Sequence, residues 1–237
     1  MKQFILILVA ACFSVAAAAQ KVINDPNAEP RNVGSFNKID ISSAFEVIIS
    51  QGNAEGVVVS SNIEGDNQNI HTSVENGKLK IGYRNPGKKW YRNQNLKAYI
   101  SVKNLDYLGG SGASKITIDG TLASPNLEID LSGATDLKGN LAVNNQLKLE
   151  LSGASDVTLT GAAGAINIRA SGASDVKAFD LTAGECNIDA SGACNVRISV
   201  EKEMNAELSG ASNVQYKGNA SIRNIKTSGA SNISRKS

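Results

Sequence analysis

The sequence predicts an all-β protein, a right-handed parallel β-helix (solenoid) with rungs of about 20 residues and an irregular β cap at its N-terminal end. Three observations support this fold class. The motif Ser-Gly-Ala-Ser, or a near copy, occurs seven times, its copies begin 18 to 21 residues apart, and alternating strands flank it. The copies begin at Ser111, Ser132, Ser152, Ser171, Ser191, Ser209 and Ser228.

The flanks of each motif have the period of two that is typical of β-strands with one buried face. Residues 147–151 precede one copy and residues 157–159 follow it. We expect the interior of that rung to be filled by Leu147, Leu149, Leu151, Val157 and Leu159. Glycine suits the corner between the two strands because it adopts positive φ without a Cβ clash. The rule for crossovers between parallel strands gives the right-handed winding.

The N-terminal segment resembles a secretory signal peptide over residues 1–19. It has a basic start at Lys2, an apolar stretch over residues 4–15 and small residues before Gln20. Residues 9–12 also resemble a lipobox, which would place a lipid on Cys12. Export is expected on either reading, to the periplasm, the outer membrane surface or the medium. Residues 20–34 are polar and are predicted to be a flexible lead-in.

The rest of the chain is predicted to form one domain over residues 35–237. Residues 35–105 follow the repeat loosely and are expected to form the irregular cap, and residues 106–237 form the rungs. Within the cap, residues 41–44 look like a degenerate corner motif. The pair Asn76-Gly77 predicts a hairpin with a type I′ turn.

Several motifs of the cap, taken together with the rungs, resemble a known bacterial family. They are Phe-x-x-Ile-x-Ile at 36–41, Ile-Ile-Ser-Gln-Gly at 48–52, Val-Glu-Asn-Gly-Lys-Leu-Lys-Ile at 74–81 and Leu-Lys-Ala-Tyr-Ile-Ser-Val at 96–102. The chain resembles the putative auto-transporter adhesin, head GIN domain family over roughly its whole mature length. The resemblance implies an exported β-helical protein with an adhesive role and no established catalytic residues.

Composition argues against several function classes. The formal net charge is +2, so nothing suggests a nucleic-acid partner. His71 is the only histidine, which excludes a site built from several histidines within one chain. We therefore expect no enzyme activity and no cofactor. Cys186 and Cys194 are expected to be small buried groups, with a disulfide or a redox role as alternatives.

One set of aspartates is a candidate for weak calcium binding. Asp136, Asp156 and Asp175 directly follow the corner motif in three successive rungs. Stacking would bring neighbouring carboxylates within about 5 Å of one another. Either calcium or solvent alone could accommodate them, and a solvated ladder is the preferred reading.

Two further columns are expected on the outside of the rungs, both with a structural role. The first contains Asn167, Asn187, Asn205 and Asn224, whose amides can hydrogen-bond along the stack. The second contains Asp130, Glu150, Arg169, Asp189, Glu207 and Lys226, as a charged solvated face.

The candidate ligand site of the cap is a loop with Trp90 and Tyr91 among basic residues, which could stack on a sugar or sit at a membrane interface. The preferred alternative is a structural role, with Trp90 packed over the end of the column. The first function hypothesis is a non-catalytic adhesion or structural module with a glycan or protein ligand. The second is a self-assembling envelope scaffold, with homo-oligomers formed through the open end near Ile233. The third is a calcium-dependent enzyme acting on polysaccharides.

Overall fold

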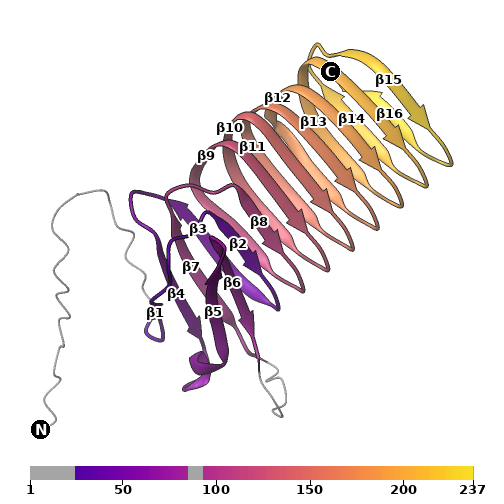
Figure 1. Cartoon of the computed structure of the whole chain (residues 1–237). Coiled ribbons are helices and arrows are strands. Elements are labelled where there is room, and N and C mark those ends of the chain that lie inside the picture. The colour runs from indigo at the N-terminus through magenta and orange to yellow at the C-terminus, as the bar shows by residue number, and fades with distance from the viewer. Residues whose placement is uncertain (1–24, 85–92, 237) are drawn as a thin grey trace, which may run out of the picture.

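The computed structural model describes residues 25–84 and 93–236, which form an elongated column of stacked strands (Figure 1). It confirms the predicted parallel β-solenoid, and the described residues contain no α-helix. No helix in this part of the chain is long and apolar enough to cross a membrane. The predicted signal peptide, Cys12, Trp90 and Tyr91 lie outside the described residues.

Long strands that bend around the column make up the regular rungs. Each pairs in parallel with the next, in the order β9 (Lys115–Leu131), β10 (Asp136–Leu151), β11 (Asp156–Ala170), β12 (Asp175–Ala190) and β13 (Asn195–Leu208). The last turns are shorter and consist of β14 (Asn213–Lys217), β15 (Ser221–Thr227) and β16 (Asn232–Arg235). Asp136 pairs with Asp156, and Asp156 with Asp175, so the motif spacing does set the register.

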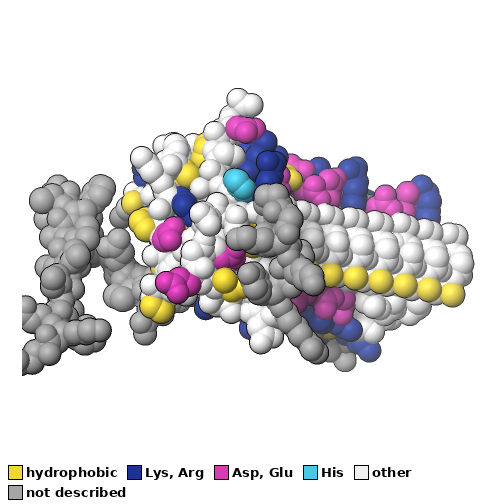
Figure 2. Space-filling view, turned by 90° about the horizontal axis from the view of Figure 1, so that it is seen from below, with side chains coloured by type: hydrophobic (Ala, Val, Ile, Leu, Met, Phe, Trp, Pro, Cys, Tyr) yellow, Lys and Arg dark blue, Asp and Glu magenta, His cyan; other side chains and the backbone are white. Residues whose placement is uncertain are grey.

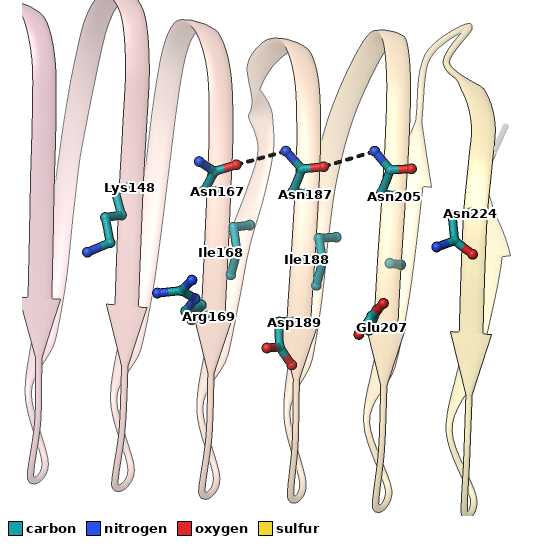
Figure 3. A pocket seen from close by; sticks show the side chains of 11 residues that line it. Lys148, Asn167, Ile168, Arg169, Asn187, Ile188, Asp189, Asn205, Glu207 and Asn224 are labelled. Carbon is teal, nitrogen blue, oxygen red and sulfur yellow. Dashed lines mark hydrogen bonds between the residues drawn. The ribbon is translucent and has the colours of Figure 1, made fainter.

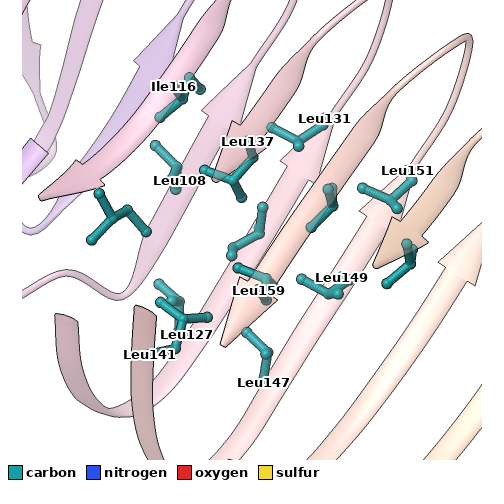
Figure 4. Packing of buried hydrophobic residues seen from close by; sticks show 14 of the residues in the cluster. Leu108, Ile116, Leu127, Leu131, Leu137, Leu141, Leu147, Leu149, Leu151 and Leu159 are labelled. Atoms are coloured by element: carbon teal, nitrogen blue, oxygen red, sulfur yellow. The ribbon is translucent and has the colours of Figure 1, made fainter. Parts of the chain in front are cut away.

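The interior is a continuous aliphatic core, as the alternating pattern predicts (Figure 4). Leu147, Leu149, Leu151, Val157 and Leu159 are all buried. Parallel register places each beside its equivalent in the next rung, for example Leu149 beside Ile168. Each rung therefore completes the core of its neighbours, which is why such repeats are stable only as a stack.

The corner of each rung is fixed by backbone geometry. Gly172 has φ of +76°, and a Cβ on it would lie 2.4 Å from the carbonyl oxygen of Gly153 in the preceding rung. The next residue, Ala173, donates its N–H to that same oxygen at 2.7 Å. Two constraints therefore select glycine here, the left-handed conformation and the close approach of the neighbouring rung.

The fourth residue of the motif closes the corner from inside. The buried Ser155 hydroxyl donates to the carbonyl oxygen of Ser152 at 2.9 Å, and Thr135 makes the same contact with Ser132 at 2.8 Å. Cys194 occupies the equivalent place with its Sγ 3.3 Å from the oxygen of Ser191. A small side chain with a hydrogen to donate is thus the common requirement.

The solenoid begins inside the region predicted to be irregular. β2 (Lys38–Ile41) and β3 (Phe45–Gln51) form a rung whose strands stack on β8 (Tyr107–Gly110) and β9. Ser43 takes the place of the corner glycine with φ of +82°, and its carbonyl oxygen accepts from Ala113 N–H at 3.1 Å. The degenerate motif at residues 41–44 is therefore a true corner. β6 (Lys78–Tyr83) and β7 (Leu96–Val102) add one more parallel layer above it.

Antiparallel strands close the N-terminal end. β4 (Gly56–Ser61) pairs with β7, β5 (Ile70–Glu75) pairs with β6, and β1 (Glu29–Arg31) covers β4. The hairpin between β5 and β6 turns at Asn76 and Gly77, both at positive φ, as a type I′ turn requires. Residues 29–31 of the predicted lead-in form β1, whose backbone pairs with β4 at the edge of the sheet.

A buried carboxylate organises the cap below β4. Asp66 lies in a 3-10 turn (Asp66–Asn69) and is only 5% exposed. Its Oδ1 accepts from Asn69 Nδ2 and the Tyr83 hydroxyl, both at 2.8 Å. Its Oδ2 accepts from the Ser61 hydroxyl at 3.0 Å and from Gln94 Nε2 at 2.6 Å. Four donors from different segments thus converge on one side chain.

Candidate functional site

A polar groove on the outside of the solenoid is the best candidate site. It has a volume of about 400 Å³ and crosses successive rungs from β10 to β15 (Figure 3). Its polar lining consists of Lys148, Asn167, Arg169, Asn187, Asp189, Asn205, Glu207 and Asn224. All of these except Lys148 belong to the two predicted outward columns, and Lys148 is in register with Asn167. Because the groove follows the stack, its long direction is that of the solenoid axis.

The upper wall of the groove is the predicted asparagine ladder. Asn187 Nδ2 donates to Asn167 Oδ1 and Asn205 Nδ2 donates to Asn187 Oδ1, each at 2.9 Å (Figure 3). Asn224 continues the column in register with Asn205. An amide has two N–H donors and an oxygen with two lone pairs. Within the ladder, Asn187 uses one donor and one lone pair, so it can still offer one of each to a ligand.

The lower wall is the charged column, whose register agrees with the sequence prediction. Glu128 and Lys148 are in register with the asparagine column, and Lys148 reaches across to Glu150 of the charged column. Lys148 Nζ lies 2.7 Å from Glu128 Oε1 and 2.9 Å from Glu150 Oε1, and Arg169 Nη1 lies 3.2 Å from the same Glu150 oxygen. Such exposed pairs contribute little to stability. They do hold the cationic side chains at defined places along the groove.

The end of this face nearest the cap is more acidic. Burial, followed by the charges of Glu150 and Glu128, raises the pKa of the Asp130 carboxyl. Burial and the charge of Asp130 raise the pKa of Tyr107 to about 12, so its hydroxyl stays protonated and donates to Asp130 at 3.5 Å. The side chains of this face are therefore mainly acidic near the cap, at Glu128, Asp130 and Glu150, and of both signs beside the asparagine ladder.

Toward the corner, the groove adjoins a second hollow of about 340 Å³ that shares Arg169 and Asp189 with it. Its lining includes the first serines of three corner motifs, Ser152, Ser171 and Ser191. Beyond them lies the corner surface itself. Figure 2 shows a strip there that carries no charge, with charged side chains gathered along both sides. The corner serines, the asparagine ladder and the charged column thus run side by side along one face of the solenoid.

The aspartates proposed for calcium do stack in register, Asp136 beside Asp156 and Asp156 beside Asp175. Cations of the adjacent outward column lie close to Asp156 and Asp175 and offset the repulsion between these two carboxylates. Lys177 Nζ lies 3.4 Å from Asp175 Oδ2 and 3.9 Å from Asp156 Oδ2, and Arg197 Nη1 lies 3.4 Å from Asp175 Oδ1. Residues 25–84 and 93–236 contain no group of three or more acidic, histidine or cysteine side chains that could hold a metal.

The remaining sequence candidates are separate from the groove. Cys186 and Cys194 are both buried and free, so the alternative of a disulfide between them is wrong. Burial raises the pKa of the Cys186 thiol to about 12, which keeps it protonated and unreactive. His71 is exposed on β5, in the cap.

Comparison with protein families decides the relationship that the motifs suggested. The family described as putative auto-transporter adhesin, head GIN domain matches residues 35–220. The chain belongs to this family. The head GIN match begins just before β2 and extends to the start of β15, so it covers both the cap and the regular rungs.

Solved structures share the head GIN architecture at low sequence identity. A putative adhesin from Bacteroides fragilis NCTC 9343 is 20% identical with a TM-score of 0.80, covering 88% of this chain and 96% of that one. A putative lipid binding protein from Parabacteroides distasonis ATCC 8503 is 18% identical (TM-score 0.65, 90% and 98% covered). A putative adhesin from Parabacteroides merdae ATCC 43184 is 16% identical (TM-score 0.66, 89% and 96% covered). A comparison with curated proteins finds no match.

The groove was not among the ligand sites that the sequence suggested for this head GIN protein. Both of its walls were predicted as columns, but each was assigned a structural role. The spacing of the two columns in the sequence could have predicted that they lie side by side. Asn187 and Asp189 are two residues apart, so both point outward from one strand, and the same offset recurs at Asn205 and Glu207.

Proposed function

We propose that this head GIN protein is an exported, non-catalytic adhesion module whose polar groove binds an extended carbohydrate chain. The observation that carries the proposal is the asparagine ladder. It repeats a paired donor and acceptor once per rung, about every 4.8 Å along the axis. Sugar hydroxyls both donate and accept, and neighbouring hydroxyls of an extended chain can contact consecutive amides.

The charges of the groove favour the same ligand class. Lys148 and Arg169 are balanced by Asp189 and Glu207, so the lining has no excess of one sign. A strongly anionic polymer would require a cluster of unpaired cations, and here the cations contact Glu128 and Glu150. Ladder bonds also fix the amides before a ligand arrives, which lowers the entropic cost of binding.

Family membership and the leader-like N-terminus support export. We expect the mature protein to begin at Gln20 and to carry no lipid. Intact-mass measurement of protein secreted by an expressing bacterium checks this. A mass that fits a chain beginning at a diacylated Cys12 would contradict it.

Binding is tested on a glycan array with the purified chain from Gln20 onward. In the variant Asn187→Leu, the side chain keeps its size but the ladder loses its central donor and acceptor. We expect affinity for the best array ligand to fall about tenfold or more, as for the loss of one to two hydrogen bonds. Titration calorimetry with that ligand measures the change.

The matched control is Asn195→Leu, the same substitution at an exposed position that follows the corner motif and does not line the groove. It should leave carbohydrate affinity unchanged. Equal losses in the two variants, or an array on which no carbohydrate binds, would argue against the groove as a carbohydrate site.

A further inference from the structure

The C-terminal end of the solenoid exposes a surface that the rungs elsewhere bury. Within the described ranges, Ile222 and Ile225 are the only exposed large hydrophobic side chains, at 42% and 37%. Both belong to β15, whose only paired neighbour is β13. The sequence placed the open edge near Ile233. The structure shows that β15 contributes the more apolar part.

These isoleucines are core residues without a covering layer. Ile222 pairs with Met204 and Ile225 with Ala206, and both partners are fully buried inward positions. The exposure of the isoleucines therefore results from their place at the end of the stack, because no described strand other than β13 pairs with β15. An unpaired strand edge beside apolar side chains is the feature that natural sheets usually protect.

Three of the four basic residues within residues 221–236 contact acceptors within the chain. Arg223 Nε lies 3.0 Å from Glu203 Oε2, and Lys226 forms an ion pair with Glu207. Arg235 donates to the carbonyl oxygen of Gly218 at 2.6 Å. These contacts draw the cations back toward the preceding rungs, so two such ends can approach with reduced like-charge repulsion.

Among residues 25–84 and 93–236, the opposite end of the column has no exposed large hydrophobic side chain. Its outermost strands are β1, which contains Pro30, and β5, whose exposed side chains are His71, Ser73 and Glu75. Proline lacks the N–H that strand addition needs. Head-to-tail stacking would thus place apolar side chains against polar ones, whereas the apolar edge is complementary to a second copy of itself.

We propose that the β15 edge is a dimer interface, at which two copies of this chain meet end to end about a two-fold axis. Such an axis sets β15 antiparallel to its partner copy, joining the free backbone groups and the Ile222 and Ile225 side chains of both copies. The contact is closed and forms a dimer rather than a fibre. The groove reaches β15 at Asn224, but the contact uses the free backbone edge and the Ile222 and Ile225 side chains, so dimerisation requires no bound carbohydrate.

Sedimentation velocity over a wide range of protein concentration tests the interface. Wild type is expected to pass from monomer to dimer and no further. Ile225→Lys places a charge at the centre of the contact on both copies, so the dimer Kd should rise at least about 100-fold. The control Ala162→Lys adds the same charge to an exposed site on β11 and should dimerise as wild type does.

Hydrogen exchange of the unmodified protein gives a readout that does not depend on how a variant folds. Amides of β15 should become more protected as concentration rises, while those of β5 do not change. A monomer at all concentrations, open-ended polymers, or a folded Ile225→Lys variant that still dimerises normally would each overturn the proposal.

Discussion

Replacing Gly172 by valine is expected to lower the free energy of unfolding by about 3 kcal/mol or more. A β-branched residue is strained at φ of +76°, and its Cβ would lie 2.4 Å from the Gly153 carbonyl oxygen. That oxygen also accepts the Ala173 N–H, so moving the rungs apart would sacrifice a 2.7 Å hydrogen bond. Urea unfolding followed by circular dichroism measures the loss.

Ala162→Val is the matched control for that substitution. Ala162 is exposed on β11, in extended backbone paired with Ala142 and Thr182. Valine is favoured in strands, so this change should shift the unfolding midpoint little. If both variants unfolded at the wild-type midpoint, the account of the corner would be wrong.

Asp66→Asn is expected to destabilise the protein by about 3 kcal/mol at neutral pH. The carboxylate accepts from four donors, and an amide in its place has one oxygen and one NH₂ group. Whichever way the amide turns, its NH₂ group faces two donors, either Ser61 and Gln94 or Asn69 and Tyr83.

The same carboxylate should make the cap sensitive to acid. Burial alone would raise the pKa of Asp66, but the hydrogen bonds from Asn69, Tyr83, Ser61 and Gln94 outweigh it and hold the pKa below its ordinary value. A lowered folded pKa means that stability is full above the unfolded pKa of about 3.9 and is lost as pH falls through the folded value.

Asp180→Asn, at an exposed carboxylate on β12, is the control. Urea midpoints of wild type and both variants should be compared at neutral pH and below about pH 4. The gap between wild type and Asp66→Asn should narrow in acid, and Asp180→Asn should follow wild type throughout. A gap that is constant with pH would show that ionisation of Asp66 does not contribute.

The regular part of the fold was predictable because its repeat fixes three things together. The spacing of the corner motif sets the register, the alternation sets the inward face, and the glycine sets the bend. Even the degenerate corner at residues 41–44 was recognisable, although serine replaces glycine there. Ser43 adopts the left-handed φ of +82° that glycine has at the other corners, and its hydroxyl oxygen accepts from the Tyr83 N–H at 3.4 Å.

The cap and the groove were less predictable for a common reason. Pairing of β1 with β4, and the contacts of Asp66 with Gln94, join residues far apart in sequence and follow no period. The two columns of the groove were found one by one, since each is visible in the repeat. The two columns enclose one groove because of the shapes of their side chains on a curved surface. Aligning equivalent positions of the repeat does not reveal those shapes.

The corner also bears on how this protein can change length during evolution. Each corner hydrogen-bonds the next rung through the same backbone positions, and the alanine N–H of one corner donates to the carbonyl at the glycine position of the corner before it. In-frame duplication or loss of one whole rung would therefore leave every remaining corner with an equivalent neighbour. Insertion of a single residue would instead turn a strand's apolar side chains outward. Column length can thus vary in whole repeats, and the length of the polar face varies with it.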